Sequence, residues 1–217
     1  MYDFYSDTKT KPSNAMLKYA LGRSFGDEQK DEDPTTLELC ERVAGLLGKE
    51  SAVFLPSGTM CNEIAIAVQT SPGDEILCDR SCHIINLEGG APAAMSGVMV
   101  HPLDGKYGQF TEKDIMQALR PKSRHMPISR MLCAEQTVNL GGGAVWPLEK
   151  LDSVAQVAKK SGLSTHLDGA RLLNACAKTG ISAARYSREY DSCWIDFTKG
   201  LGAPVGAVLA GSSEFIE

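Results

Sequence analysis

The chain has 217 residues, a net charge of −5 and 43% hydrophobic residues, values typical of a globular protein that buries a sizeable core. It contains no dense tract of lysine and arginine, which argues against a nucleic-acid-binding or anionic membrane-binding surface. No run approaches 18 apolar residues, so no membrane-spanning segment is predicted.

The seven cysteines are an odd number, and the first residues carry neither a basic start nor an apolar signal segment. We therefore expect reduced thiols and a cytoplasmic protein. Cys78 and Cys82 precede His83, but no second pair of cysteine or histidine residues stands at ligand spacing. Buried thiols are thus favoured over a metal site.

The first 50 residues are more polar than the rest and are predicted to form an N-terminal arm or helical segment, followed by one larger domain over 51–217. Asp33 and Pro34 are typical of a helix N-cap and first turn. Gly48 is a suitable end for this helix. Its predicted apolar stripe comprises Leu37, Cys40, Val43, Ala44 and Leu47.

From residue 51 onward, short apolar runs alternate with helical patterns. A helix over Pro147–Ser161, closed by Gly162, leads directly into a strand, which is typical of a βαβ unit. We therefore predict an α/β fold with a mainly parallel sheet and helices on both faces. The predicted strands are Ala52–Leu55, Glu75–Cys78, Gly97–His101, Met131–Ala134, Ser164–Asp168, Ser192–Phe197 and Val205–Ala210.

Asp168 and Lys199 each stand at the carboxyl end of a predicted strand, where open α/β sheets bind their ligands. A partly desolvated lysine is a nucleophile. Pyridoxal-phosphate enzymes use a lysine to hold the cofactor aldehyde as a Schiff base and an acid to pair with the pyridinium nitrogen. Taken alone, Lys199 also fits an ordinary loop position.

Three other features fit such a cofactor. Residues 57–59 follow the first strand and open a helix, where backbone amides bind a phosphate; the alternative is a capped helix that binds nothing. His83 could stack on a planar ring or be an ordinary loop or core histidine. Arg171 could meet a substrate carboxylate through its planar fork or form a local pair with Asp168.

Together these motifs resemble one family, the low-specificity threonine aldolases, which are pyridoxal-phosphate enzymes of the aspartate-aminotransferase fold type I. The resemblance runs through essentially the whole chain, and its last two blocks are the most specific in order and spacing. The matching blocks are residues 6–12, 32–35, 54–59, His83, 88–91, 166–171 and 199–204.

The resemblance implies that pyridoxal 5′-phosphate binds at positions matching the family motif. Lys199 would carry the cofactor, Asp168 would keep the pyridine nitrogen protonated and His83 would stack on the ring. The remaining implied cofactor contacts are Gly58 and Thr59, on the phosphate, and Gln136. Ser6 and Arg171 would contact the substrate carboxylate, and His125 would be the base near the β-hydroxyl.

The implied reaction is retro-aldol cleavage of threonine, allo-threonine and related β-hydroxy-α-amino acids to glycine and an aldehyde. The implied assembly is a homodimer or homotetramer with the site at the subunit interface. Three alternatives remain: a β-eliminating lyase with the same cofactor, a phenylserine-type aldolase and a non-catalytic fragment.

The sequence departs from the family pattern at several positions. Lys30 and Asp31 replace a tyrosine and a glycine, which bears on substrate preference, and Val138 replaces a histidine. Thr198 replaces a common serine, and Asp196 stands inside an apolar strand without an evident reason. The family's C-terminal small domain, with its further carboxylate-binding arginine, has no counterpart, so we expect a fragment with little aldolase activity.

Overall fold

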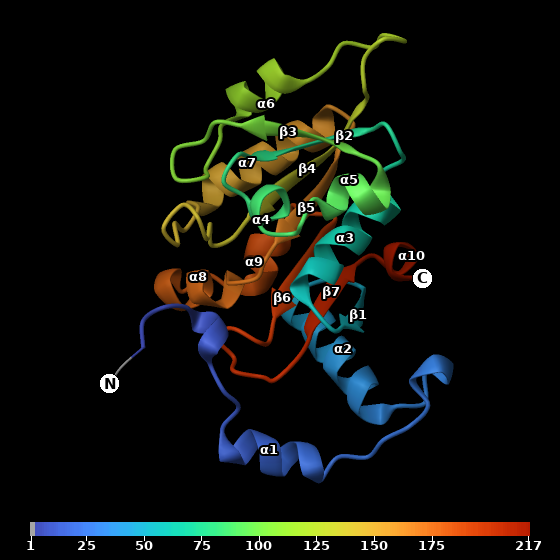
Figure 1. Ribbon diagram of the computed structural model, residues 1–217, viewed down its shortest axis with the longest axis vertical. Coiled ribbons are helices and arrows are strands. Elements are labelled where there is room, and N and C mark those ends of the chain that lie inside the picture. The colour runs from blue at the N-terminus through green and yellow to red at the C-terminus, as the bar shows by residue number, and fades with distance from the viewer. Residues whose placement is uncertain (1–2) are drawn as a thin grey trace.

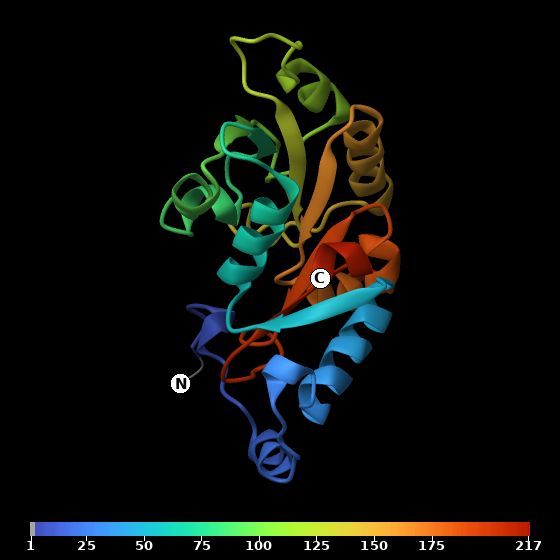
Figure 2. The same cartoon turned by 90° about the vertical axis from the view of Figure 1, so that its right-hand side faces the viewer.

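The computed structural model describes residues 3–217 and contains a seven-stranded sheet between two layers of helices (Figures 1 and 2). The strand order is β1-β7-β6-β5-β4-β2-β3. The strands are β1 (Ser51–Leu55), β2 (Glu75–Asp79), β3 (Met99–Leu103), β4 (Ser129–Glu135), β5 (Ser164–Asp168), β6 (Ser192–Asp196) and β7 (Ala207–Gly211).

The sheet confirms the predicted α/β class. The strand pairs from β3 through β6 are parallel, whereas β7 runs antiparallel to both β6 and β1. All seven predicted strands occur, but the two predicted to start at Gly97 and Val205 each begin two residues later. Gly97 ends the preceding helix at φ 64°, and Gly206 has φ 109°; both values lie outside the extended conformation of a strand.

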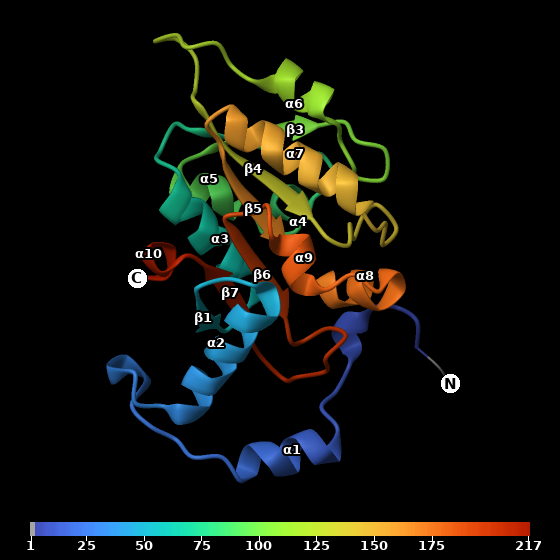
Figure 3. The ribbon, with the colours of Figure 1, turned by 180° about the vertical axis from the view of Figure 1, so that it is seen from behind.

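Helices cover both faces of the sheet (Figures 2 and 3). One face carries α3 (Gly58–Gln69), α4 (His83–Asn86) and α5 (Ala91–Ser96). The other carries α2 (Pro34–Leu47), α7 (Leu148–Lys160), α8 (Leu172–Thr179) and α9 (Ala183–Ser187). The remaining elements are η1 (Asp7–Lys9), α1 (Asn14–Leu21), η2 (Glu28–Lys30), α6 (Glu112–Ala118) and α10 (Ser213–Ile216). In the part of the chain that the structure describes, no helix is long and apolar enough to cross a membrane.

The start and end of α2 confirm the prediction from sequence. The Asp33 side chain accepts a hydrogen bond from the Thr36 amide at 2.7 Å, and Gly48 closes the helix at φ 63°. Val43, Ala44 and Leu47 are buried, but Leu37, which was predicted to belong to the same stripe, is 48% exposed. The prediction fails there because only the C-terminal part of α2 is buried against the sheet, and its first turns extend beyond it (Figure 3).

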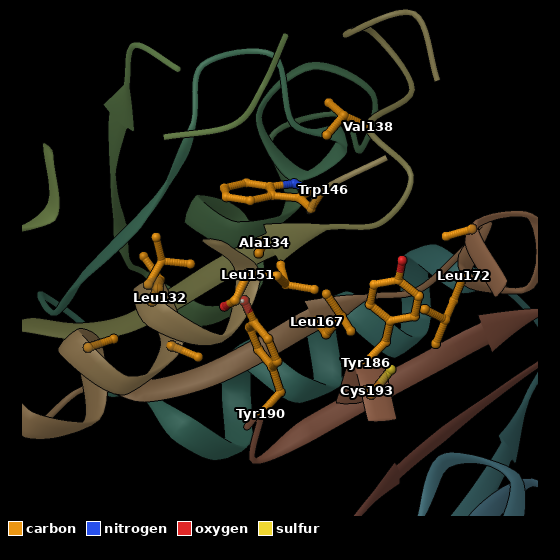
Figure 4. Packing of buried hydrophobic residues seen from close by; sticks show 14 of the residues in the cluster. Leu132, Ala134, Val138, Trp146, Leu151, Leu167, Leu172, Tyr186, Tyr190 and Cys193 are labelled. Atoms are coloured by element: carbon orange, nitrogen blue, oxygen red, sulfur yellow. Dashed lines mark hydrogen bonds between the residues drawn. The ribbon is translucent and has the colours of Figure 1, made fainter. Parts of the chain in front are cut away.

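The main hydrophobic core lies between the sheet and the layer formed by α2, α7, α8 and α9 (Figure 4). Trp146, Tyr186 and Tyr190 are its largest fully buried side chains. Tyr190 donates a hydrogen bond from its hydroxyl to the Leu151 carbonyl at 3.1 Å, which satisfies the one polar group this ring brings into the core. The strands that lead to the candidate site are therefore held in a close-packed layer.

Residues 3–33 contribute no side chain to the buried hydrophobic core. They are nevertheless anchored to the sheet, because the Thr10 hydroxyl donates to the Lys199 carbonyl at 2.6 Å. This contact joins residues 189 positions apart and places η1 beside the loop after β6 (Figure 1). The division of the chain at residue 50 stays a prediction.

Candidate active site

Acidic residues end four neighbouring strands at one edge of the sheet, Asp79 on β2 and three that lie nearer its centre. The three are Glu135 on β4, Asp168 on β5 and Asp196 on β6, and the β4–β5 register pairs Glu135 directly with Asp168. Lys199 follows Asp196 by three residues. Asp168 and Lys199 thus lie at the same edge, as the strand pattern predicts.

Asn62, on the buried face of α3, connects this edge to the helix layer. Its Nδ2 group donates to Asp168 Oδ2 at 2.9 Å and to Glu88 Oε1 at 2.7 Å. Its Oδ1 atom accepts from Trp194 Nε1 at 2.7 Å and lies 3.0 Å from His166 Nε2. The side chain is fully buried and uses both ends of its amide, so its orientation is fixed.

His166 takes one tautomer because of these contacts. Asn62 Oδ1 can only accept, so His166 Nε2 carries the hydrogen and Nδ1 accepts from the Ser192 hydroxyl at 2.7 Å. Complete burial lowers the pKa of His166 from 6.5 to about 3. The His166 ring is therefore neutral and helps to fix the Asn62 side chain by donating a hydrogen bond to it.

Asp168 is a buried carboxylate, 2% exposed, that receives neutral donors only. Its Oδ1 accepts from the Ala170 amide at 3.1 Å, and its Oδ2 accepts from Asn62. None of the ion pairs among residues 3–217 includes it. Burial raises the pKa of this carboxyl, while the two donors oppose that change. Such a group is stabilised by a cationic ligand.

His83 begins α4 and is held from both its backbone and its ring. Its amide donates to Glu135 Oε2 at 3.0 Å, and its Nδ1 lies 2.7 Å from Glu88 Oε1. The hydrogen bond to Glu88 raises the pKa of His83 despite partial burial. Burial and the nearby Asp168 charge raise the pKa of Glu135 to about 7.

Lys199 forms an ion pair with Asp196, and its Nζ lies 5.6 Å from the Trp194 ring centroid. The side chain is 13% exposed. Asp196 also accepts from the amide of Thr198. This arrangement accounts for an acidic residue at the end of an apolar strand, since Asp196 neutralises and positions the lysine.

The first turn of α3 lies at the same edge. Ser57 caps the helix by accepting from the Met60 amide at 3.2 Å, and the Gly58 and Thr59 amides are among those that a helix leaves without internal partners. A Cβ atom on Gly58 would lie 2.2 Å from the Trp194 ring. Glycine is therefore required here by the indole, a role that its sequence motif does not reveal.

Arg171 forms a bidentate ion pair with Asp7, with Nε and Nη2 each 2.8 Å from a carboxylate oxygen. Its partner is thus Asp7 of η1, not Asp168 as in the local-pair alternative. The pair leaves Nη1 of Arg171 for another acceptor. Ser6 precedes Asp7 and accepts from the Thr8 amide and hydroxyl at 3.2 and 2.8 Å, so it caps η1 beside the arginine.

The side chains of two predicted site residues do not lie beside Asp168. The Gln136 side chain is fully buried, and its Oε1 accepts from the Trp146 amide at 3.2 Å. His125 is exposed in the loop before β4, where its Nε2 accepts from Arg124 Nε at 3.1 Å. That loop adjoins the amino end of β4, about 20 Å along the strand from Glu135 (Figure 1).

Within a single chain, neither side chain lies beside Asp168, so the predicted roles of both residues stay predictions. Gln136 turns inward because its amide satisfies the Trp146 main chain, and His125 lies at the opposite sheet edge. Among residues 3–217, no group of His, Cys, Asp or Glu side chains forms a candidate metal centre.

Several residues at the site carry no role in the sequence prediction, namely Asp7, Asn62, Glu88, Glu135 and Asp196. Asn62 has a detectable signal, because it shares the buried stripe of α3 with Gly58, Cys61, Ala65 and Ile66. A polar side chain on such a stripe requires polar partners. The partners themselves come from other elements and have no local signal.

Comparison with known proteins shows that the model of a family described as beta-eliminating lyase matches residues 3–217. The chain is 39% identical over 220 residues to a probable low-specificity L-threonine aldolase of Arabidopsis thaliana, covering 99% of this chain and 61% of that protein. It is 33% identical over 218 residues to the low specificity L-threonine aldolase of Escherichia coli, covering 100% and 65%.

A solved structure of a threonine aldolase from Leishmania major matches with a TM-score of 0.87 and 24% identity, covering 100% of this chain and 64% of that one. This likeness confirms the predicted fold. The chain spans 52–65% of the length of the curated relatives that it matches.

Proposed function

Since the chain belongs to the beta-eliminating lyase family, we propose that it binds pyridoxal 5′-phosphate and cleaves threonine, allo-threonine and related β-hydroxy-α-amino acids to glycine and an aldehyde. The relatives named as threonine aldolases support this choice of reaction. Their family depends on pyridoxal phosphate and acts on small amino acids.

The observation that carries the proposal is Asp168, a buried carboxylate without a cationic partner in the described chain. A protonated pyridine nitrogen supplies the missing cation and a hydrogen-bond donor. Asn62 and the Ala170 amide hold the two carboxylate oxygens in place before any ligand arrives. The residues at this edge therefore fit the cofactor.

The other groups of the cofactor also have suitable partners. The free amides of Gly58 and Thr59, with the Thr59 hydroxyl, would hold the phosphate at the start of α3. His83, fixed through Glu88, would lie against the ring. Lys199 would hold the aldehyde carbon and must leave Asp196 to do so. Gln136 stays a predicted cofactor contact that the side-chain position does not support.

Bound pyridoxal phosphate supplies a conjugated ring that accepts the electrons of the broken Cα–Cβ bond. The chain's own contribution is to orient the amino acid and to move its protons. Arg171 would bind the substrate carboxylate through Nη1, while Asp7 holds its other side, and the Ser6 hydroxyl would add a hydrogen bond.

Because its Nδ1 atom faces Glu88, His83 has Nε2 as the candidate acceptor of the β-hydroxyl proton. The same nitrogen, once protonated, can return the proton. The role of His125 stays a prediction, and it requires the loop over 121–128 to reach a site other than the one in its own chain.

A second copy of the chain is part of the proposal. Leu21, at the end of α1, and Phe25, in the segment after it, are 87% and 85% exposed, and apolar surface of this kind is typical of an interface. We propose a homodimer or homotetramer, which light scattering coupled to size-exclusion chromatography would detect. A cytoplasmic location rests on the seven free cysteines.

A product assay tests the reaction. The chain with added pyridoxal phosphate is incubated with threonine, allo-threonine or phenylserine, and glycine and aldehyde are quantified together with 2-oxo acid and ammonia. The aldolase proposal predicts glycine and aldehyde in equal amounts. Formation of 2-oxo acid and ammonia instead would favour the β-eliminating alternative, and bound cofactor without either product pair would contradict both reactions.

A further inference from the structure

Two glutamates on the α3–α5 side of the sheet share a buried polar site, and only Glu88 has a role in the proposed chemistry. Glu63 follows Asn62 on α3, and Glu88 lies in the turn before α5. Both Glu63 oxygens and Glu88 Oε2 are buried and meet no hydrogen-bond donor among residues 3–217. Three buried acceptors without a donor are a large cost for a native fold.

A shared proton removes that cost. The carboxyl groups of Glu63 and Glu88 lie within reach of each other, and a hydrogen bond forms between them only when one is protonated, because two neighbouring carboxylates repel each other. Glu88 Oε1 already faces the donors Asn62 Nδ2 and His83 Nδ1, each at 2.7 Å. Glu88 Oε2 is therefore the oxygen that still needs a donor, and Glu63, which has no other hydrogen-bond partner among residues 3–217, is the group that can supply one.

We propose that Glu63 is a positioning residue, which stays protonated and donates a hydrogen bond to Glu88 Oε2. Glu88 then uses its other oxygen to hold the His83 ring and the Asn62 amide. Since the same Asn62 amide donates to Asp168, one protonated carboxyl orients both partners of the cofactor ring. This consequence for the cofactor rests on the proposed function, but the shared proton does not.

The charges around the pair fix the direction of its pH dependence. His83 faces Glu88 from α4, and Asp168 and Glu135 act on His83 from β5 and β4. Burial and the bond to Glu88 raise the pKa of Glu63 from 4.5 to about 8. The folded chain thus keeps a proton that the unfolded chain releases, so stability falls as the pH rises from 4.5 towards 8.

The pair also predicts how substitutions behave. Glu63→Gln retains a donor for Glu88 Oε2 and cannot ionise, so it mimics the protonated acid. Glu63→Leu removes the donor and leaves Glu88 Oε2 unsatisfied, which is expected to weaken cofactor binding roughly tenfold. Glu41→Gln removes one exposed carboxylate from α2 and is the matched control for the change in net charge.

The first experiment needs no cofactor. Chemical unfolding of the chain is measured between pH 6 and pH 9 for the wild type, Glu63→Gln and Glu41→Gln. The proposal predicts that wild type and Glu41→Gln lose stability as the pH rises, and that Glu63→Gln loses clearly less. Equal pH dependence in Glu63→Gln and wild type would overturn the shared proton.

The second experiment titrates pyridoxal phosphate into the same variants and Glu63→Leu at pH 7 and pH 9. We expect Glu63→Gln to bind like wild type at pH 7 and better than wild type at pH 9. Equal weakening in Glu63→Gln and Glu63→Leu would overturn the positioning role. If no variant, wild type included, binds the cofactor, the proposed function and the positioning role fail together, while the unfolding curves still decide the shared proton.

Discussion

The inner and outer halves of the candidate active site differ in how their charges are balanced. The inner half consists of Asn62, His83, Glu88, His166 and Asp168, and the outer half of Ser6, Asp7, Arg171, Asp196 and Lys199. In the inner half, the Asp168 anion is buried among neutral donors. In the outer half, both cations are already paired, Lys199 with Asp196 and Arg171 with Asp7.

This difference assigns different tasks to the two halves. The inner half is fixed by hydrogen bonds between its side chains, and Asp168 has no cation paired with it there, so a cationic ring can enter without rearrangement. The outer half must exchange partners, because Lys199 has to leave Asp196 before it can hold an aldehyde. We therefore expect substitutions in the inner half to affect the cofactor, and substitutions in the outer half to affect the substrate or the attachment step.

The largest effect is expected for Asp168→Asn. Loss of the carboxylate leaves the pyridinium nitrogen without its counter-charge and should weaken pyridoxal phosphate binding roughly 100-fold or more. Asp79→Asn is the matched control, because Asp79 also ends a buried strand, but among residues 3–217 its side chain bonds only to Ser81 and Gly105. Equal cofactor affinity in the Asp168 and Asp79 variants, measured by fluorescence titration, would break the distinction between the halves.

His166, which contacts Asn62, should make the folding stability depend on pH in the acidic range. Burial lowers the pKa of His166 from 6.5 to about 3, so the unfolded chain binds a proton that the folded chain does not, and stability falls as the pH drops below 6.5. Over about two pH units this amounts to about 2–3 kcal/mol. Denaturation curves should show a shallower loss in His166→Gln.

His125→Gln provides the comparison for that experiment, because His125 is exposed at the other edge of the sheet. It should keep the wild-type loss of stability on acidification. A His166→Gln variant with the same acid dependence as His125→Gln would mean that His166 is not held neutral.

The smallest effect is expected in the outer half, for Asp7→Asn. Without the bidentate pair, the Arg171 guanidinium is no longer held in one orientation. Binding of threonine or glycine should therefore weaken roughly tenfold, with cofactor affinity unchanged. Asp3→Asn, which removes an exposed ion pair with Lys9, should change neither. The spectral response of the bound cofactor to added amino acid measures the amino-acid affinity. An Asp7 variant with weakened cofactor affinity instead would contradict the distinction between the two halves.

The sequence predicts the inner half incompletely because its partners come from different elements. Asp168 and Lys199 could be placed together, since each follows an apolar strand and parallel strands share one carboxyl edge. Asn62 lies on an apolar helix stripe and is recognisable as a buried polar group. Its four partners, however, lie on β5, β6 and the turn before α5, and only the packed fold brings these together.

The outer half was harder to predict because it depends on chain segments far apart in the sequence. Asp7 and Arg171 are 164 residues apart, so the local spacing favoured Asp168 as the alternative partner. His125 and Gln136 were assigned from the family resemblance alone. Gln136 follows Glu135 at the carboxyl edge, but its side chain bonds to Trp146, and His125 lies at the opposite edge.

The most direct test of the account is where pyridoxal phosphate attaches to the chain. The wild type and Lys199→Ala are mixed with the cofactor and reduced with borohydride, and the labelled peptide is identified by mass spectrometry. The account predicts a label on Lys199 in the wild type and none in Lys199→Ala. A label of equal yield in Lys199→Ala, or one on another lysine of the wild type, would contradict it.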